Sequence, residues 1–331
     1  MPSESSGPSL RVWVGQLFDA EGEKRLKAGL DGHELLRPDG GTESNLTLAS
    51  PCEKCRSADV VFGQPVVSDL LDNDRLRWAA LSTAGYTRYD NDEVRNHFTD
   101  RRIPLTNASG VYDEPCAQHV LAQILAGRRA LPESADAAAR HKWEYDKVRG
   151  ITHLLTGTVA IFGYGAIAIG LVQLLAPFNV EIVGVRRRAR GDEAIPIIET
   201  DDESAVNDLL ARADHVVNIL PAHPGTTHYF NAERLGLIRP SACYYSIGRG
   251  STTDQQALIA ALQAGRLQQA WLDVTDPEPL PASDPLWDAP RCYITPHVAG
   301  GLQREDSVLV GHFLANFERL LAGEPLTDRI V

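Results

Sequence analysis

Apolar and polar residues alternate along the N-terminal third of the chain in the pattern of short buried strands separated by amphipathic helices. Strand-like segments occupy residues 10–18, 58–63 and 76–83, a weaker one occupies residues 101–107, and a helical pattern occupies residues 21–30. Strands that alternate with helices form a parallel sheet with helices packed on its faces. The first part of the chain therefore predicts an α/β unit.

A second and more regular alternating series fills the rest of the chain. It opens with a predicted helix from Asp113 to Leu131, with Glu114 and Pro115 in the first turn, and a less regular polar stretch follows. The later elements are strands predicted at 158–163, 180–185, 215–220, 242–248, 270–274 and 292–297, and helices predicted at 168–178, 203–213, 255–265 and 306–323. A second parallel sheet is expected, with the boundary between the two series near residues 105–110.

One uncharged stretch could be mistaken for a membrane span. Residues 150–180 contain no Asp, Glu, Lys or Arg, which is long enough to cross a bilayer. Its middle reads GYGAIAIG and Pro177 stands near its end, which favours a strand, a tight turn and a buried helix. The first ten residues also lack the basic and apolar regions of a signal peptide. We expect a soluble protein that does not enter membranes.

Composition narrows the class of protein further. A chain of 331 residues is long enough for about two domains, and its 43% apolar and 23% charged residues are ordinary for a globular enzyme. The formal net charge of −12 argues against nucleic acid as a partner. Five cysteines without framework spacing favour a reducing cytoplasm. Cys52 and Cys55 form a lone C-x-x-C without a second ligand pair, so we expect ordinary helix residues and no metal site.

A glycine-rich turn follows the predicted strand at 158–163 and opens the next helix. It reads G-x-G-x-x-A, ending at Ala168. The first glycine of this pattern permits a tight turn, the second lets a pyrophosphate approach the backbone, and a small third residue lets helix and strand pack closely. Strand, turn, helix and a second strand at the right distance together predict a dinucleotide site. The residues expected to contact the cofactor there are Gly163, Tyr164, Gly165, Ala166 and Ile167.

Four arginines lie within five positions directly after the next predicted strand. Arg186 stands about 20 residues beyond the glycine turn, where this type of fold usually has an acidic residue that accepts the ribose 2′-hydroxyl. A guanidinium there can bind a 2′-phosphate instead. Arg186, with Arg187 or Arg188 beside it, therefore predicts a preference for NADP(H), with NAD(H) as the other option. The competing interpretation is a merely solvated charge run.

Three later segments carry residues suited to reducing a carbonyl. SIGRGSTTD contains Arg249, LDVTDPEPL contains Asp273 and Glu278, and ITPHVAGG contains His297. Each segment follows a predicted parallel strand, at the edge where open α/β sheets bind ligands. Ketone reduction needs a hydride and a proton on adjacent atoms. An imidazolium can supply the proton, a neighbouring carboxylate can orient it, and a guanidinium can stabilise the charge that develops on oxygen.

In order and spacing, these motifs resemble the D-isomer-specific 2-hydroxyacid dehydrogenase family over nearly the whole chain. The resemblance implies an α/β fold of two doubly wound Rossmann-like lobes. The NAD(P)-binding lobe, residues 107–298, would be inserted into a catalytic lobe formed by residues 1–106 and 299–331, with the active-site cleft between them. It also implies a homodimer, to which the segment around residues 113–155 would contribute much of the contact.

The resemblance further implies roles for single residues. Arg249 would hold the substrate carboxylate and polarise its keto oxygen, His297 would be the general acid and base, and Glu278 would be its paired carboxylate. Asp273 would accept a hydrogen bond from the nicotinamide carboxamide, and Thr226 would lie near the cofactor phosphate or ribose. A further loop would bind the substrate carboxylate through the backbone N–H groups of Ala84, Gly85 and Tyr86.

The sequence therefore predicts an NADP(H)-preferring dehydrogenase acting on a small 2-keto or D-2-hydroxy acid, with glyoxylate or hydroxypyruvate as the best substrate candidates. Two alternatives stay open: a phosphoglycerate-type dehydrogenase using NAD, and a dinucleotide-sensing, corepressor-like binding protein of the same fold. Three positions depart from the family pattern, namely Ser246, Ala168 and Gln118. The remaining histidines considered are expected to be structural, namely His119, His153, His223, His228 and His312.

Overall fold

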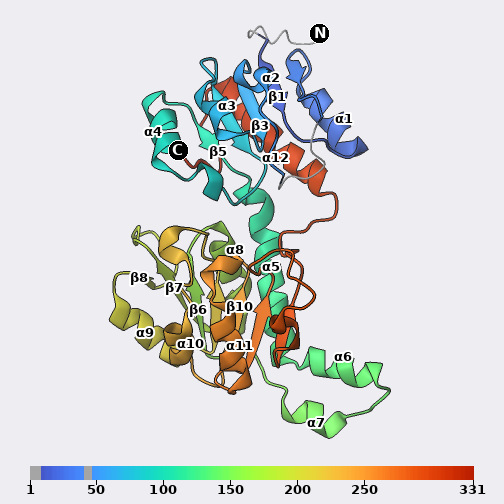
Figure 1. The fold of residues 1–331 in the computed structure, drawn as a ribbon, viewed down its shortest axis with the longest axis vertical. Coiled ribbons are helices and arrows are strands. Elements are labelled where there is room, and N and C mark those ends of the chain that lie inside the picture. Colours follow the sequence, from blue (N-terminus) through green and yellow to red (C-terminus); the bar gives the residue numbers. More distant parts are fainter. Residues whose placement is uncertain (1–8, 41–46) are drawn as a thin grey trace. The chain divides into compact units, whose positions relative to one another are not determined.

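The computed structural model describes residues 9–40 and 47–331, which form two compact units (Figure 1). Unit 1 contains the described residues up to Tyr112 together with Leu302–Val331, and unit 2 contains Asp113–Gly301. The boundary falls inside one helix, α5 (Ser109–Arg128). Both units are built on a parallel sheet with helices on its two faces, so the predicted fold of two α/β Rossmann-like lobes is confirmed.

Unit 1 contains a five-stranded parallel sheet with the strand order β2-β1-β3-β4-β5. Its strands are β1 (Arg11–Val14), β2 (Glu34–Leu36), β3 (Val60–Gly63), β4 (Trp78–Leu81) and β5 (Leu105–Thr106). The strand order reverses between β1 and β3. In open α/β sheets such a reversal opens a crevice at the carboxyl ends of the strands, where ligands bind.

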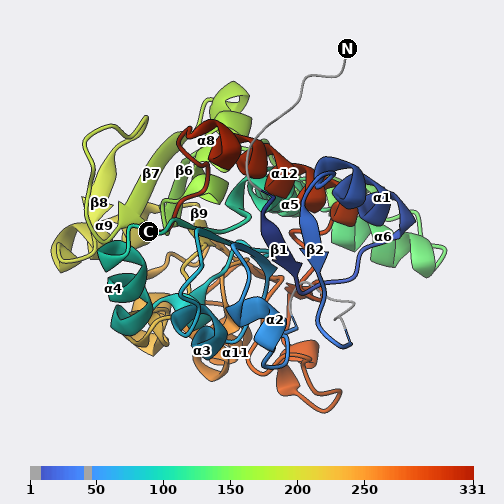
Figure 2. The same ribbon diagram turned by 90° about the horizontal axis from the view of Figure 1, so that it is seen from above.

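Helices cover both faces of this sheet because neighbouring strand residues point to opposite sides. Val12 and Val14 pack into one core with the helices α1 (Ala20–Gly29) and α12 (Glu305–Ala322). Trp13 packs into the other core, which is covered by the helices α2 (Glu53–Arg56), α3 (Val67–Leu71) and α4 (Asp92–Asp100). The helices α1 and α12 lie side by side although they come from opposite ends of the chain (Figures 1 and 2).

Stacked aromatic rings hold the C-terminal helix on the N-terminal sheet. The Phe313 ring on α12 lies with its centroid 4.2 Å from that of Phe62 on β3 and 5.2 Å from that of Trp78 on β4. All three side chains are buried. Close aromatic packing of this kind stabilises a core beyond the area that it buries. The segment after unit 2 is thereby tied into unit 1.

Unit 2 contains a seven-stranded parallel sheet with the strand order β12-β11-β10-β9-β6-β7-β8. Its strands are β6 (Thr158–Phe162), β7 (Glu181–Arg186), β8 (Ile197–Glu199), β9 (His215–Asn218), β10 (Cys243–Ser246), β11 (Gln269–Leu272) and β12 (Cys292–Ile294). The first six strands in sequence follow the dinucleotide-binding order, with the reversal between β6 and β9. This reversal places the glycine turn after β6 beside the loop after β9.

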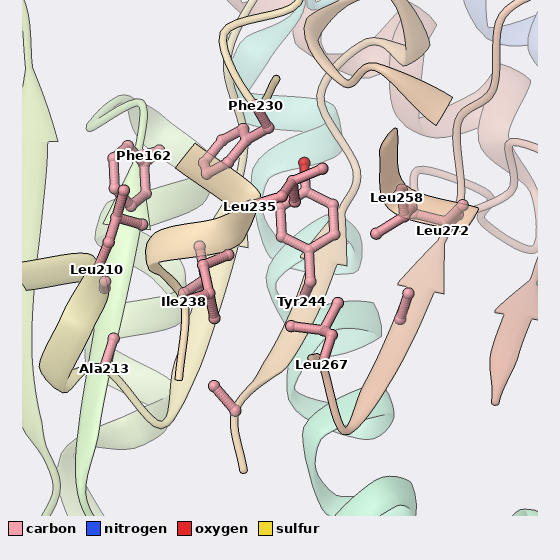
Figure 3. Close-up of a cluster of buried hydrophobic side chains, with 14 of the residues drawn as sticks. Phe162, Leu210, Ala213, Phe230, Leu235, Ile238, Tyr244, Leu258, Leu267 and Leu272 are labelled. Carbon is pink, nitrogen blue, oxygen red and sulfur yellow. The ribbon is translucent and has the colours of Figure 1, made fainter. Parts of the chain in front are cut away.

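The two faces of the second sheet carry different helices. Helix α5 and helix α8 (Ala166–Leu175) pack on one face. The other face is covered by α9 (Glu203–Arg212), α10 (Ala232–Leu237) and α11 (Gln255–Gln263). Figure 3 shows the core between the sheet and these three helices, in which Phe162, Phe230 and Tyr244 lie among leucines from the covering helices. Two further helices, α6 (Leu131–Ala139) and α7 (Tyr145–Gly150), extend away from the sheet (Figure 1).

The structure corrects several element boundaries predicted from the sequence. Helix α5 begins at Ser109 rather than Asp113, because the Asn107 side chain accepts a hydrogen bond from the Ser109 N–H, and Pro115 therefore lies inside the helix. The stretch described as irregular contains α6 and α7. Four elements too short for a clear period were not predicted, namely β2, α3, β8 and α10, and the nine-residue helix α4 was also missed. Short 3-10 turns lie at Thr87–Tyr89, Ala176–Phe178, Pro224–Thr226, Gly250–Thr252 and Pro285–Asp288.

The uncharged stretch at residues 150–180 forms the strand, turn and helix that its glycines predict. It includes β6, the glycine turn and α8. Across residues 9–40 and 47–331, no helix combines the length and the apolar character that a bilayer crossing requires.

Replacing Phe313 with Ala should lower the free energy of unfolding by about 3–5 kcal/mol, because it leaves a cavity between two buried aromatic rings. Urea denaturation followed by tryptophan fluorescence measures this change. Leu321→Ala is the matched control on the same helix, where the side chain is 52% exposed, and its effect should stay within about 0.5 kcal/mol. Equal effects of the two substitutions would contradict the packing described for α12.

Candidate active site

The turn after β6 accepts only glycine at its first position. Gly163 has a φ of +96°, in the region that favours glycine. A Cβ atom there would lie 2.8 Å from the backbone oxygen of Ile219, which belongs to the loop after β9. The missing side chain therefore lets the turn and the neighbouring loop approach each other closely.

The second glycine leaves the start of helix α8 open. Gly165 is the N-cap of α8, it provides no side-chain hydrogen bond, and a Cβ atom on it would meet nothing within 4 Å. The N–H groups of Ala166 and Ile167 in the first turn have no acceptor within the helix, and a helix N-terminus attracts anions. Ala168 is fully buried, as close packing of helix on strand requires. A dinucleotide pyrophosphate fits this cradle.

Tyr164 closes one side of the turn. Its side chain lies against β7, where a Cβ atom on Gly184 would come within 3.0 Å of the Tyr164 ring. Burial raises the pKa of its hydroxyl, and the nearby Glu193 carboxylate raises it further, against a lowering by Arg186. Tyr164 therefore connects the glycine turn to the charged loop after β7.

The loop after β7, which carries the cluster of arginines, is held together by the Glu193 carboxylate. Arg186 donates a hydrogen bond to Glu193 at 2.8 Å, and both side chains are largely buried. The backbone N–H groups of Arg190 and Gly191 also donate to the Glu193 carboxylate, each at 2.8 Å. The bond from Arg190 contributes most to lowering the pKa of Glu193 to about 2. Arg187 is exposed.

Arg249 lies just after β10 and is mostly buried. Its Nη1 donates to the backbone oxygen of Gly248 at 2.6 Å. Burial lowers the pKa of the guanidinium, and the negative charge of Glu278 opposes that shift. A partly desolvated guanidinium interacts strongly with an anionic ligand, because the effective dielectric around it is low.

An imidazole and a carboxylate meet beside Arg249. His297 Nδ1 lies 2.7 Å from Glu278 Oε2, and Glu278 Oε1 accepts the backbone N–H of Thr275 at 3.0 Å. Since an ionised carboxylate only accepts, the shared proton is on Nδ1 and Nε2 is left for a ligand. His297 has a φ of +53°, a strained backbone that persists where the surroundings hold it.

Asp273 holds the loop that carries His297. Its buried carboxylate accepts hydrogen bonds from the Thr295 hydroxyl at 2.6 Å and from the N–H groups of Val298 at 2.9 Å and Ala299 at 2.8 Å. Its backbone oxygen accepts the His297 N–H at 2.8 Å. From the sequence, Asp273 was assigned only to the cofactor, whereas the structure also gives it this positioning role.

The sheet brings the three predicted catalytic residues to one edge. Arg249 follows β10, Glu278 follows β11 and His297 follows β12, and these strands are neighbours in the sheet. The carboxyl ends of parallel strands share an edge, which is also the edge of the glycine turn. The arrangement combines a fixed cation, an oriented proton donor and an anion cradle. This combination suits hydride and proton transfer to an anionic carbonyl compound.

Two further groups support the loops of the site. His119 on α5, which the sequence predicts to be structural, has its Nε2 3.2 Å from the Thr295 hydroxyl and 2.9 Å from Gln123 Nε2. The sequence signal for this contact was the spacing of His119 and Gln123, two polar residues four positions apart in the helix. Asn218, at the end of β9, donates at 2.8 Å to the Thr252 hydroxyl, which donates to the Arg249 backbone oxygen at 2.6 Å.

The remaining predicted residues lie in two loops. Thr226 ends the 3-10 turn after β9 and donates to the Pro221 backbone oxygen at 2.6 Å, which shapes the loop next to the glycine turn. The loop Ala84–Tyr86 follows β4 in unit 1. The Asn107 side chain donates to the Ala84 oxygen at 2.7 Å, and the Thr83 hydroxyl donates to the Gly85 oxygen at 2.7 Å.

Comparison with known proteins gives a consistent result. Residues 121–299 match the family model described as D-isomer specific 2-hydroxyacid dehydrogenase, NAD binding domain. The chain is 30% identical to glyoxylate/hydroxypyruvate reductase B of Pectobacterium carotovorum, over 90% of this chain and 92% of that protein. It is 27% identical to D-3-phosphoglycerate dehydrogenase of Methanocaldococcus jannaschii, over 96% of this chain and 56% of that longer protein.

A solved structure shows the same fold. The D-isomer specific 2-hydroxyacid dehydrogenase from Xanthobacter autotrophicus Py2, determined in complex with NADPH and MES, has a TM-score of 0.76 and 24% identity, over 98% of each chain. The family model covers more than half of the present chain, and the relatives cover nearly all of it. The resemblance found in the sequence is confirmed: the chain belongs to the D-isomer specific 2-hydroxyacid dehydrogenase family and is an NAD(P)-dependent dehydrogenase.

Proposed function

We propose that the protein reduces a small 2-keto acid, with glyoxylate or hydroxypyruvate as the leading substrates, to the D-2-hydroxy acid, with NADPH as the preferred cofactor. The observation that carries the proposal is the His297–Glu278 pair beside the buried Arg249, on the sheet edge that also holds the glycine turn. The Pectobacterium relative is named for the same two substrates.

The three catalytic residues have different tasks in this reaction. The bound nicotinamide supplies the hydride to C2 of the keto acid. Arg249 pairs with the substrate carboxylate and stabilises the charge that develops on the keto oxygen. His297 donates a proton from Nε2 to that oxygen, which completes the alcohol. Glu278 holds the imidazole in place and stabilises its charged form through Nδ1. Backbone N–H groups of the loop Ala84–Tyr86 are proposed to bind the substrate carboxylate as well.

The cofactor is proposed to contact several parts of unit 2. Gly163, Tyr164, Gly165, Ala166 and Ile167 would receive the pyrophosphate. Thr226 would lie near its phosphate or ribose, and Asp273 would accept from the carboxamide. Arg186 and Arg187 favour a 2′-phosphate because they place positive charge at the end of β7. The Xanthobacter structure of the same fold holds NADPH.

A second copy of the chain is the proposed protein partner. The segment containing α6 and α7 exposes Trp143 (93% exposed) and four other large apolar side chains: Leu131, Tyr145, Ile151 and Leu154. Exposed apolar surface of this extent, rich in aromatic rings, is typical of protein interfaces. We propose that this surface is buried in a homodimer.

The cytoplasm is the proposed compartment. All five cysteines lie in the described part of the chain, and all five are free thiols. Burial raises the pKa of Cys116 to about 12, which keeps it a thiol at neutral pH. Free thiols persist in reducing compartments.

The reaction is tested by measuring the oxidation of NADPH with each member of a panel of 2-keto acids. The same measurements are made with NADH. We expect turnover of glyoxylate or hydroxypyruvate, with NADPH giving the higher kcat/KM. Turnover of a phosphorylated hydroxy acid with NAD instead would favour a phosphoglycerate-type enzyme. Cofactor binding without turnover of any acid, together with stable capture of a partner protein, would favour the corepressor-like alternative.

His297→Ala should lower kcat by about 100-fold or more, because it removes the proton donor. NADPH binding, measured by fluorescence titration, should change little since the imidazole is not part of the phosphate cradle. His312→Ala is a matched control in unit 1 and should leave kcat unchanged. A kcat for His297→Ala within a fewfold of the wild type would exclude the proposed acid.

Gly165→Ala should weaken NADPH binding about tenfold or more without lowering thermal stability. The new methyl group has free space in the protein and would fill the space needed by the pyrophosphate. Fluorescence titration and thermal unfolding measure the two effects separately. Unchanged affinity would mean that the pyrophosphate lies elsewhere.

Replacing Trp143 and Leu154 together with Glu should turn the dimer into a monomer, because charged side chains oppose burial in an apolar interface. Sedimentation velocity measures the change. Leu321→Glu, at an exposed apolar position on α12, is the control and should remain dimeric. A wild-type monomer, or a double variant that stays dimeric, would contradict the proposed surface.

A further inference from the structure

A largely buried carboxylate organises the loop between β7 and β8. The side chain of Glu193 is only 6% exposed. Its Oε1 accepts from Arg186 Nη1 and from the Arg190 N–H, and its Oε2 accepts from the Gly191 N–H, all at 2.8 Å. The three donors satisfy the buried carboxylate and hold the loop around it in one conformation.

Glu193 also faces the cofactor turn. The Tyr164 ring, from the glycine turn, and Ile195, two residues after Glu193, both lie beside Gly184 on β7. The Glu193 carboxylate raises the pKa of the Tyr164 hydroxyl and Arg186 lowers it, so all three groups lie in one region beside β7. The adenosine ribose of a dinucleotide lies in this region of a Rossmann fold.

We infer that Glu193 competes with the cofactor's 2′-phosphate for the guanidinium of Arg186, and that this competition sets how strongly the protein prefers NADP(H) over NAD(H). The inference rests on the proposed dehydrogenase function and deepens it. It makes Glu193 a specificity-determining residue in addition to the arginines already considered.

The competition follows from charge. Hydrogen bonds from the backbone N–H groups of Arg190, Gly191 and Glu193 itself, and from Arg186, lower the pKa of Glu193 to about 2 despite its burial, so the carboxylate is ionised at neutral pH. A 2′-phosphate brought to Arg186 must therefore share the guanidinium with an existing anion and approach a negative charge. NADH lacks that phosphate and leaves the Arg186–Glu193 pair intact. Arg187 and Arg188 are exposed and follow Arg186 directly in the sequence. Their positive charge attracts the 2′-phosphate, so NADPH still binds.

A purely structural role for Glu193 makes the opposite prediction. If the carboxylate only held the loop and presented Arg186 to the phosphate, removing its charge would weaken binding of the phosphate. The substitution Glu193→Gln removes the charge and keeps one acceptor oxygen, which can still accept from Arg186 and from the Arg190 N–H, while the Gly191 N–H loses its acceptor. This variant therefore separates the two roles.

The experiment measures binding of two cofactor fragments, 2′,5′-ADP and 5′-AMP, to the full chain by isothermal titration calorimetry. Glu193→Gln should tighten 2′,5′-ADP binding about tenfold and change 5′-AMP binding by less than about twofold. Adding Arg186→Ala to Glu193→Gln should abolish the gain, since the released guanidinium is its source. Asp192→Asn removes the same charge at the exposed neighbouring position and should change neither affinity by more than about twofold.

The outcomes separate this inference from the proposed function. Unchanged or weaker 2′,5′-ADP binding in Glu193→Gln would overturn the competition, and so would an equal gain in Asp192→Asn or a gain that persists without Arg186. A wild-type chain that binds neither fragment, NADPH nor NADH would instead refute the proposed cofactor site. Fragment binding does not require turnover, so a wrong substrate assignment would leave this test unaffected.

Discussion

The parallel pairing of β10, β11 and β12 is the constraint on which the candidate active site depends. Each strand ends at the same edge of the sheet, and each is followed by one of Arg249, Glu278 and His297. These residues are separated by up to 48 positions in the sequence, from 249 to 297. The hydrogen bond between His297 and Glu278 forms only because two neighbouring strands deliver their loops to one place.

A second layer of polar side chains holds the loops beneath the reacting groups. The carboxylate of Asp273 binds the loop around His297, and the Asn218 amide binds Thr252 beneath Arg249. Both side chains are buried and hydrogen-bonded within the protein, which fixes their positions beneath the site. Positioning of this kind keeps a strained histidine backbone in one conformation, as a site for directed proton transfer requires.

The cofactor end of the same sheet balances opposite charges. Arg186, at the end of β7, is already paired with Glu193, which under the proposed function would compete with a 2′-phosphate. Under the proposed function, the open N-terminus of α8 would bind the pyrophosphate independently of the Arg186–Glu193 pair, because pyrophosphate is common to both cofactors. Affinity for dinucleotides and discrimination between them would then reside in different parts of unit 2.

The two α/β series, the glycine turn and the segments around Arg249, Glu278 and His297 were all predictable from the sequence, because strand and helix periods and turn glycines are local signals. The sequence did not reveal short elements such as β8, which are too brief to show a period, or the start of α5 at Ser109, which depends on a side-chain cap. Tertiary structure alone decided that His119 contacts Thr295 and that Glu193 holds Arg186. Such pairings depend on where the backbone places each side chain, and residue type does not encode that geometry.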